Sequence, residues 1–214
     1  LSVEERLERG AKLWRGDGAL VTLRNDRRMV NSVRSLRRRG IPVVDMVLNR
    51  PTVALPRVVN DHAAVGRLGA RHFTERNFRE VAWFATGTGH VHTLRFTALR
   101  KALAGQANVR DWTLARNCDW DEFLRWLRAR LGDVPRPLGV LTYDESDAAR
   151  FLNACLDLGV SIPDEVSILA VGNDFRLCER QPIPISDIEQ NMERGGFAAA
   201  ALLDRLMNGG KPPK

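Results

Sequence analysis

The sequence is poor in the features that define several classes of protein. Its 214 residues include one tyrosine, three cysteines and four lysines, and no apolar run approaches the roughly 20 residues that cross a bilayer. The charged N-terminal stretch contains no apolar signal-peptide core. With 44% hydrophobic and 28% charged residues, the composition excludes disordered, collagen-like and disulfide-stapled chains. From the length and these absences we expect a cytoplasmic globular chain with one large or two small domains and no membrane partner. Because it begins at Leu1 without a methionine, we expect it to be a fragment.

The residue sets that carry common chemistry are also missing. The three cysteines are too far apart for a CxxC metal site, and we expect all of them to be reduced and buried. His90 and His92 have no further ligand at metal spacing, so we expect solvent-exposed imidazoles and no metal. The stretch at 86–90, TGTGH, lacks the lysine of a phosphate loop and the GxGxxG spacing of a dinucleotide site. No GxSxG elbow is present. The sequence therefore predicts neither an enzyme nor a bound cofactor.

Arginine supplies most of the charge. The chain has 33 Lys and Arg against 26 Asp and Glu, a net charge of +7. The densest cluster is Arg34, Arg37, Arg38 and Arg39, near the end of a predicted helix, where cations suit the negative end of the helix dipole. A solvated helix end is the favoured interpretation, and a surface for DNA phosphates is the alternative.

Short apolar runs alternate with helical patterns along the chain, roughly every 20 to 30 residues. The stretches between the runs carry apolar residues at three- and four-residue spacing, which is typical of helices with one buried face. Wholly apolar strands separated by helices indicate parallel sheets covered on both faces, so the predicted fold class is a three-layer α/β/α sandwich. The predicted strands are residues 19–23, 41–46, 58–59, 81–85, 138–143 and 166–171.

Polar side chains follow three of these strands. Asp61, Asp144, Asn173 and Asp174 all come within a few residues of a predicted strand end. Because the carboxyl ends of parallel strands face a common crevice, we expect these groups to share one edge. Carboxylates and amides suit sugar hydroxyls, which both donate and accept hydrogen bonds. Each of these residues is also a good helix N-cap.

Arg95 lies in the predicted helix after the glycine-containing stretch at 87–89. It is placed at the edge of the apolar stripe of that helix, so a partly buried guanidinium facing the crevice is one interpretation. A surface salt bridge is the other. A guanidinium fork would complement the carboxylates in binding hydroxyl groups.

The order of these motifs resembles the effector domain of lac-repressor-like regulators, which share the fold of periplasmic sugar-binding proteins. The resemblance rests on GIPVVD at 40–45, VVND at 58–61, RFTAL at 95–99 and LGVSIPDEVSI at 158–168. Ala98 stands where the family usually has glycine. The stretch at 171–188 is most similar to the sensor domains of XylR-type regulators, in which this fold precedes an AraC-type DNA-binding domain.

This resemblance implies a two-lobed fold whose first strand and helix are missing before Leu1. Residues 1–86 with 189–210 would form the N-terminal lobe, 87–188 the C-terminal lobe, and 211–214 a linker toward an absent C-terminal module. The resemblance implies effector contacts from Asp61 on the first lobe and, on the second lobe, from Arg95, Tyr143 or Asp144, and Asn173, with Asp174 beside them. Asn173 stands where many members have aspartate, which replaces an acceptor-only group by one that also donates.

The function implied by the resemblance is sugar sensing for a transcriptional regulator. A small carbohydrate, a pentose such as xylose, would bind between the two lobes, and lobe closure would be transmitted to a DNA-binding domain that lies outside this chain. A homodimer is expected. The alternatives are a stand-alone sugar receptor of a transport system and a degenerate domain that only dimerises.

Overall fold

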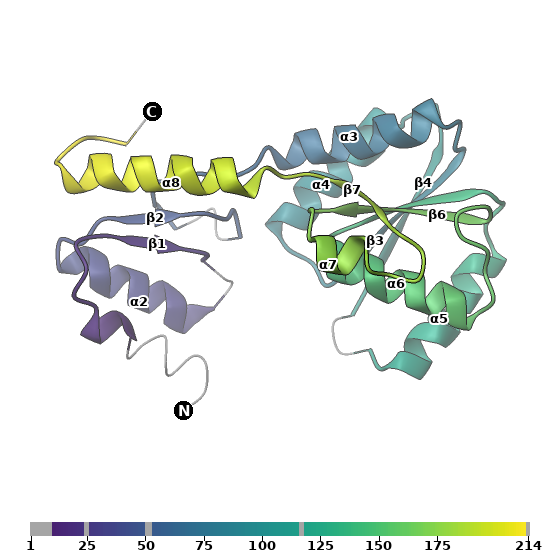
Figure 1. Cartoon of the computed structure of the whole chain (residues 1–214), viewed down its shortest axis with the longest axis horizontal. Coiled ribbons are helices and arrows are strands. Elements are labelled where there is room, and N and C mark those ends of the chain that lie inside the picture. Colours follow the sequence, from purple (N-terminus) through teal and green to yellow (C-terminus); the bar gives the residue numbers. More distant parts are fainter. Residues whose placement is uncertain (1–9, 24–25, 50–52, 116–117, 213–214) are drawn as a thin grey trace. The chain divides into compact units, whose positions relative to one another are not determined.

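The computed structural model describes residues 10–23, 26–49, 53–115 and 118–212, and the chain divides into two compact units (Figure 1). Unit 1 comprises residues 1–60 and 191–214, and unit 2 comprises residues 61–190. Within the described ranges, no helix is both long enough and apolar enough to span a bilayer.

Unit 2 is built on a sheet of five parallel strands in the order β4-β3-β5-β6-β7. The strands are β3 (Glu80–Thr86), β4 (Asn108–Leu114), β5 (Leu138–Thr142), β6 (Val166–Val171) and β7 (Ser186–Ile188). The helices are α3 (His62–Glu75), α4 (His90–Ala102), α5 (Trp120–Gly132), α6 (Glu145–Asp157) and the short α7 (Phe175–Cys178). Parallel pairing requires helical crossovers, which accounts for the alternation of the two kinds of element.

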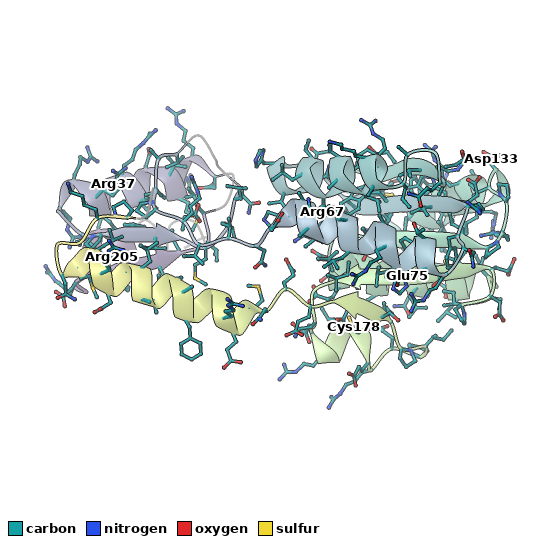
Figure 2. All side chains as sticks on the ribbon, turned by 90° about the horizontal axis from the view of Figure 1, so that it is seen from above. Arg37, Arg67, Glu75, Asp133, Cys178 and Arg205 are labelled. Carbon is teal, nitrogen blue, oxygen red and sulfur yellow. The ribbon has the colours of Figure 1, made fainter. Side chains whose placement is uncertain are left out.

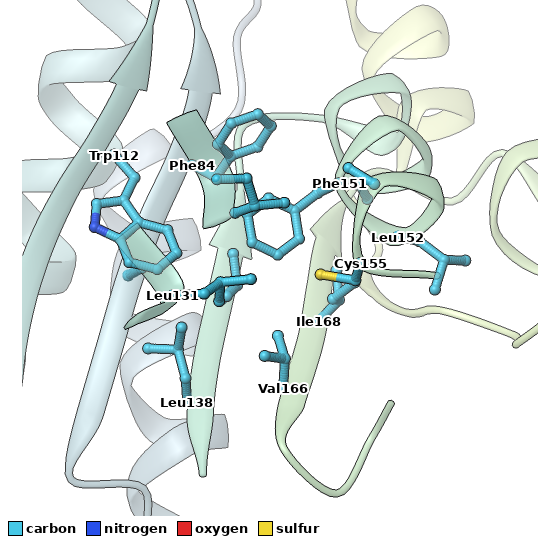
Figure 3. Packing of buried hydrophobic residues seen from close by; sticks show 14 of the residues in the cluster. Phe84, Trp112, Leu131, Leu138, Phe151, Leu152, Cys155, Val166 and Ile168 are labelled. Atoms are coloured by element: carbon cyan, nitrogen blue, oxygen red, sulfur yellow. The ribbon is translucent and has the colours of Figure 1, made fainter. Parts of the chain in front are cut away.

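Both faces of this sheet are buried, and β3 shows how. Its residues alternate between faces, so Trp83 packs with the α3 and α4 residues Phe73 and Leu99 on one side. Phe84 packs on the other side with Phe151 and other residues of α5 and α6, as Figure 3 shows for part of that cluster. A strand that is buried on both faces must be apolar throughout, which explains the continuous run at 81–85.

Unit 1 repeats the same arrangement with fewer strands. Strands β1 (Ala19–Val21) and β2 (Val43–Asp45) pair in parallel, and helices α2 (Arg27–Arg38) and α8 (Met192–Met207) accompany them. Val43 packs with the apolar face of α2, whereas its neighbour Val44 packs with α8. Helices therefore cover opposite faces of the sheet in each unit, and the predicted three-layer α/β fold with parallel sheets is confirmed.

The division of the chain differs from the prediction. The boundary lies between residues 60 and 61, not at 86 and 87, so residues 61–86 belong to unit 2. The physical reason is that β3 is hydrogen-bonded between β4 and β5, inside the sheet of unit 2. The glycine-containing stretch at 87–89 lies within unit 2. Residues 213–214 of the predicted linker lie outside the described residues.

Several local predictions are also corrected. Residues 58–59 do not form a strand; only the neighbouring Arg57 makes an isolated bridge, to Asp45. The strands β4 and β7 were not predicted. His92 is buried and bonds Thr113 Oγ1 through Nε2 at 2.9 Å, so the expectation of an exposed imidazole is wrong for this residue. All three cysteines are free, but Cys118 is only partly buried.

Candidate ligand site at the carboxyl ends of the strands in unit 2

Four side chains from different segments of unit 2 meet at the carboxyl ends of its strands. Arg95 comes from α4 and His62 from the start of α3, while Tyr143 follows β5 and Gln190 follows β7. Because all the strands are parallel, the residues after β5 and β7 emerge at the same edge of the sheet. We call Arg95, His62, Tyr143 and Gln190 the Arg95 cluster.

The guanidinium of Arg95 is the centre of this cluster. Its Nη1 donates to the backbone oxygen of Tyr143 at 2.5 Å, and its Nη2 donates to Gln190 Oε1 at 2.8 Å. The guanidinium carbon lies 5.1 Å from the centre of the Tyr143 ring, a cation–π distance. Arg95 is only 5% exposed, so the interpretation as a surface salt bridge is wrong. Two of its nitrogens are held in place by these contacts.

The third nitrogen of the Arg95 guanidinium is unsatisfied. Its Nε is buried and has no hydrogen-bond partner among the described residues, and no ion pair within those residues includes Arg95. Burial lowers the pKa of Arg95, while Tyr143, Asp144 and Glu145 oppose this shift. A buried charged group without full compensation is costly, and such groups concentrate at binding sites.

His62 faces Arg95 and is neutral at physiological pH. Its Nδ1 lies 3.5 Å from Nη2 of Arg95, at the limit of a hydrogen bond. Burial, followed by the positive charge of Arg95, lowers the pKa of His62 to about 4. A neutral imidazole can accept a hydrogen bond from the guanidinium, which a charged one cannot.

Asp144 begins α6 as its N-cap. Its Oδ1 accepts from the backbone N–H of Asp147 at 2.9 Å, so the capping interpretation is confirmed for this residue. The buried Asp147 in turn accepts from Thr86 N and Oγ1 at 2.9 and 2.6 Å, which ties the end of β3 to α6. Burial raises the pKa of Asp147. Thus Asp144 has a structural contact, and its role toward a ligand stays a prediction.

The turn after β6 carries Asn173 and Asp174, both exposed. The backbone N–H of Asp174 donates to Glu145 Oε1 at 3.1 Å, and its Oδ1 accepts from Arg176 N at 2.9 Å. Gly172 has φ +123, and a Cβ there would overlap with the Glu145 carboxylate. Glycine at this position therefore lets Glu145 bridge the ends of β5 and β6, and leaves the Asn173 amide at the surface.

Asp61 is placed differently from the prediction. It lies in unit 2, not in a separate lobe from Arg95. As N-cap of α3 it accepts from Ala64 N at 2.8 Å, and its Oδ2 lies 3.2 Å from Nη2 of Arg67, which Figure 2 labels on α3. The Ala64 bond and the Arg67 charge lower the pKa of Asp61. Both carboxylate oxygens thus have partners within α3, and the neighbouring His62 is the residue that meets Arg95.

Three members of this region were missed by the sequence reasoning: His62, Gln190 and Glu145. His62 directly follows a predicted site residue, and Gln190 follows the short strand β7, which the apolar pattern did not mark. Gln190 and Arg95 are 95 positions apart, so no local pattern connects them. That His62 and Gln190 lie beside Arg95 can be recognised only once the order of the strands in the sheet is known.

The comparisons with known proteins agree with this architecture. A family model described as a periplasmic binding protein-like domain matches residues 70–214. The xylose operon regulatory protein of Haemophilus influenzae is 22% identical over 162 residues, which cover 73% of this chain and 42% of that protein. The chain thus spans less than half the length of that curated relative.

Solved structures share the fold at low identity. A probable maltose operon transcriptional repressor from Staphylococcus aureus has a TM-score of 0.80 at 14% identity, covering 96% of this chain and 74% of that one. A xylose-binding transcription activator has a TM-score of 0.80 at 18% identity, with coverages of 99% and 62%. A regulator from Alkaliphilus metalliredigens in complex with D-xylulofuranose has a TM-score of 0.73 at 20% identity, with coverages of 97% and 75%.

Proposed function

Because the chain belongs to the periplasmic binding protein-like domain family, we propose that it is the sugar-sensing effector domain of a transcriptional regulator, with the Arg95 cluster as part of its sugar site. The DNA-binding module would lie outside this chain. The relatives named for xylose and crystallised with a pentulose support a pentose as the ligand.

The observation that carries this proposal is the unsatisfied Nε of Arg95. A sugar hydroxyl can accept from Nε while donating to a neighbouring carboxylate or amide oxygen. Asp144, Asn173 and Asp174 follow strands whose carboxyl ends lie at the same edge. The half-buried ring of Tyr143 offers an apolar surface beside the guanidinium. Polar groups at one edge of the sheet, together with an aromatic ring, suit a hydroxyl-rich ligand.

The test is calorimetric and thermal-shift titration of the chain with a panel of pentoses and hexoses. A sugar at 100 times its dissociation constant should stabilise the folded state by about 2.7 kcal/mol. Asn173→Ala should weaken binding because it removes one amide at the site, and it should leave stability unchanged because Asn173 is exposed. Asn153→Ala, on the exposed side of α6, is the matched control. If no sugar in the panel binds, the proposal is wrong.

A second measurement separates regulation from transport. In the whole protein, the sugar should change affinity for operator DNA, because only differential binding to two states can shift an equilibrium. Sugar binding without any change in DNA affinity would favour a stand-alone sugar receptor.

A further inference from the structure

The positive charge of the protein is concentrated in unit 1. Residues 1–60 and 191–214 contain 17 Lys and Arg and 8 Asp and Glu, a net charge of +9, whereas residues 61–190 contain 16 and 18, a net charge of −2. The excess that gives the chain its net charge of +7 is therefore not spread evenly. A basic surface of this kind attracts polyanions.

Helix α2 carries the densest part of this charge. The helix contains no acidic residue, and Arg27, Asn31, Arg34 and Arg38 recur at intervals of four, three and four, which places them on one face. Its apolar residues Val30, Val33 and Leu36 are buried on another face, and the four polar ones are exposed. Together with Arg37, which Figure 2 labels on α2, we call these four residues the basic face of α2.

This face is hollowed. Asn31, Arg34, Arg37 and Arg38 line an open hollow of about 710 Å³, and none of its lining residues in the described part of the chain is a carboxylate. Arg37 donates from Nη1 to the backbone oxygen of Ala54 at 3.0 Å, which fixes its position. Arg34 and Arg38 form no hydrogen bond or ion pair with any residue in the described ranges. Two exposed guanidinium groups therefore flank a concave surface whose charged lining residues, among those that the structure describes, are all arginines.

The helix dipole accounts for part of this pattern only. Arg37 and Arg38 lie in the last turn, where cations are favoured. Arg27 and Arg28, however, lie in the first turn, at the positive end of the dipole, where the N-cap Asp26 provides a carboxylate but the turn itself contains no acidic residue. By contrast, α5 and α6 both carry acidic residues in their first turn, as the dipole favours. A solvated helix end therefore does not explain an arginine-rich face that runs the full length of α2.

We propose that the basic face of α2 binds the phosphate backbone of duplex DNA, without reading its sequence. Guanidinium groups match phosphate oxygens in a bidentate geometry that lysine cannot form, and every cation of this face is an arginine. Phosphate contacts of this kind position a protein on DNA and add affinity to whatever module reads the bases. The choice of DNA as the polyanion rests on the proposed function as a regulator.

The test uses the 214-residue chain and a fluorescein-labelled DNA duplex of arbitrary sequence, with anisotropy measured over a series of salt concentrations. Arg34→Gln/Arg38→Gln should bind about tenfold more weakly at low salt, and should lower the slope of log K against log salt by about 2, since each phosphate contact contributes about 0.9. Arg125→Gln/Arg128→Gln removes the same charge from the exposed side of α5 and should bind DNA as the unsubstituted chain does. Unfolding curves establish that both variants are folded.

Three results would overturn the proposal. The first is no DNA binding by the unsubstituted chain at low salt, and the second is an equal loss in both double variants, which would reduce the effect to net charge. The third is preferential binding of polyglutamate or of phosphatidylglycerol vesicles in competition with the duplex, which would assign the face to an acidic protein or a membrane. Sugar-induced thermal shifts in Arg34→Gln/Arg38→Gln report separately on the sugar site, so failure of one proposal does not imply failure of the other.

Discussion

Each unit buries a charged side chain near the carboxyl end of a parallel strand, but the two environments differ. In unit 1, Asp45 is fully buried at the end of β2 and accepts hydrogen bonds from Leu23 N, Val47 N and Arg57 Nε at 3.1, 3.2 and 3.0 Å. In unit 2, Arg95 is almost as buried and yet leaves Nε without a partner. The carboxylate of Asp45 has an opposite charge beside it, whereas Arg95 faces a neutral histidine.

The difference indicates what each group is for. A buried charge with all its partners in place stabilises the fold around it, and Asp45 links β1, β2 and the segment at Arg57. A buried charge with one donor left over is incompletely compensated, and a ligand can supply the missing acceptor. Asp45 and Arg95 both lie near the end of a strand, so their position does not distinguish them. What distinguishes the structural site from the candidate ligand site is whether every hydrogen-bonding atom of the buried charge has a partner.

The largest expected effect is the loss of stability on substitution of Asp45. Asp45→Asn keeps the size of the side chain but removes the negative charge that pairs with the Arg57 guanidinium, and an amide cannot accept with both of its ends. We expect a loss of about 3–5 kcal/mol in the free energy of unfolding, measured by urea denaturation. Asp17→Asn, at an exposed position, should have no measurable effect. If the free energy of unfolding falls by less than about 1 kcal/mol, Asp45 does not contribute substantially to the stability of unit 1.

Arg95→Met should act mainly on binding. The substitution keeps the apolar stem of the side chain and removes the fork that contacts Tyr143 and Gln190. We expect affinity for the best-binding sugar of the panel to fall at least about 100-fold, equivalent to about 2.8 kcal/mol, in calorimetric titrations. Arg100→Met, further along α4 and exposed, should bind as before. If Arg95→Met binds the sugar with unchanged affinity, Arg95 is not part of the sugar site.

Gly66→Ala tests whether the position of Arg95 depends on helix packing. Gly66 lies in α3 where a Cβ would overlap with the backbone oxygen of Arg95, so alanine must push α3 and α4 apart. We expect destabilisation by about 1–3 kcal/mol, measured by thermal and urea unfolding, together with weaker sugar binding. Gly196→Ala is the matched control in α8, where a Cβ would meet nothing within 4 Å. It should stabilise by about 0.5–1 kcal/mol. Neutral behaviour of Gly66→Ala would show that this contact is not restrictive.

The apolar pattern predicts those parts of the fold that are buried on both sides. The strand at Val166–Val171 has the predicted bounds because each of its faces meets a helix layer. Strand β4 lies at the edge of the sheet and carries Arg110 and Asp111, so half of its surface is solvated and no apolar run marks it. Strand β7 is only three residues long, and two of them are exposed. Edge strands of this kind are visible only from tertiary pairing.

The candidate site was only partly predictable for a related reason. Family resemblance pointed to Arg95, but its burial depends on the close approach of α3 at Gly66, which helical spacing alone does not reveal. His62 and Gln190 lie 33 and 95 positions away from Arg95 in sequence. Their convergence follows from strand order, and strand order is a property of the whole sheet. Side chains that cap helices, such as Asp144, were easier to predict because an N-cap is a local structure.

The last prediction concerns the pH dependence of the Arg95 cluster. Burial and Arg95 lower the pKa of His62 from 6.5 to about 4 in the folded state. As the pH falls from 6.5 to 4, the unfolded chain therefore binds a proton that the folded chain excludes, and the free energy of unfolding decreases with a slope below the one-proton limit of about 1.4 kcal/mol per pH unit. The asparagine in His62→Asn cannot titrate. The free energy of unfolding of this variant, measured with urea, should therefore fall less over this pH range than that of the unsubstituted chain. In Arg95→Met, NMR titration should give a higher pKa for His62, because the positive charge that opposes protonation is gone. Equal pH slopes for the unsubstituted chain and His62→Asn would show that His62 is not held neutral against a buried charge, and the contrast with Asp45 would lose its electrostatic basis.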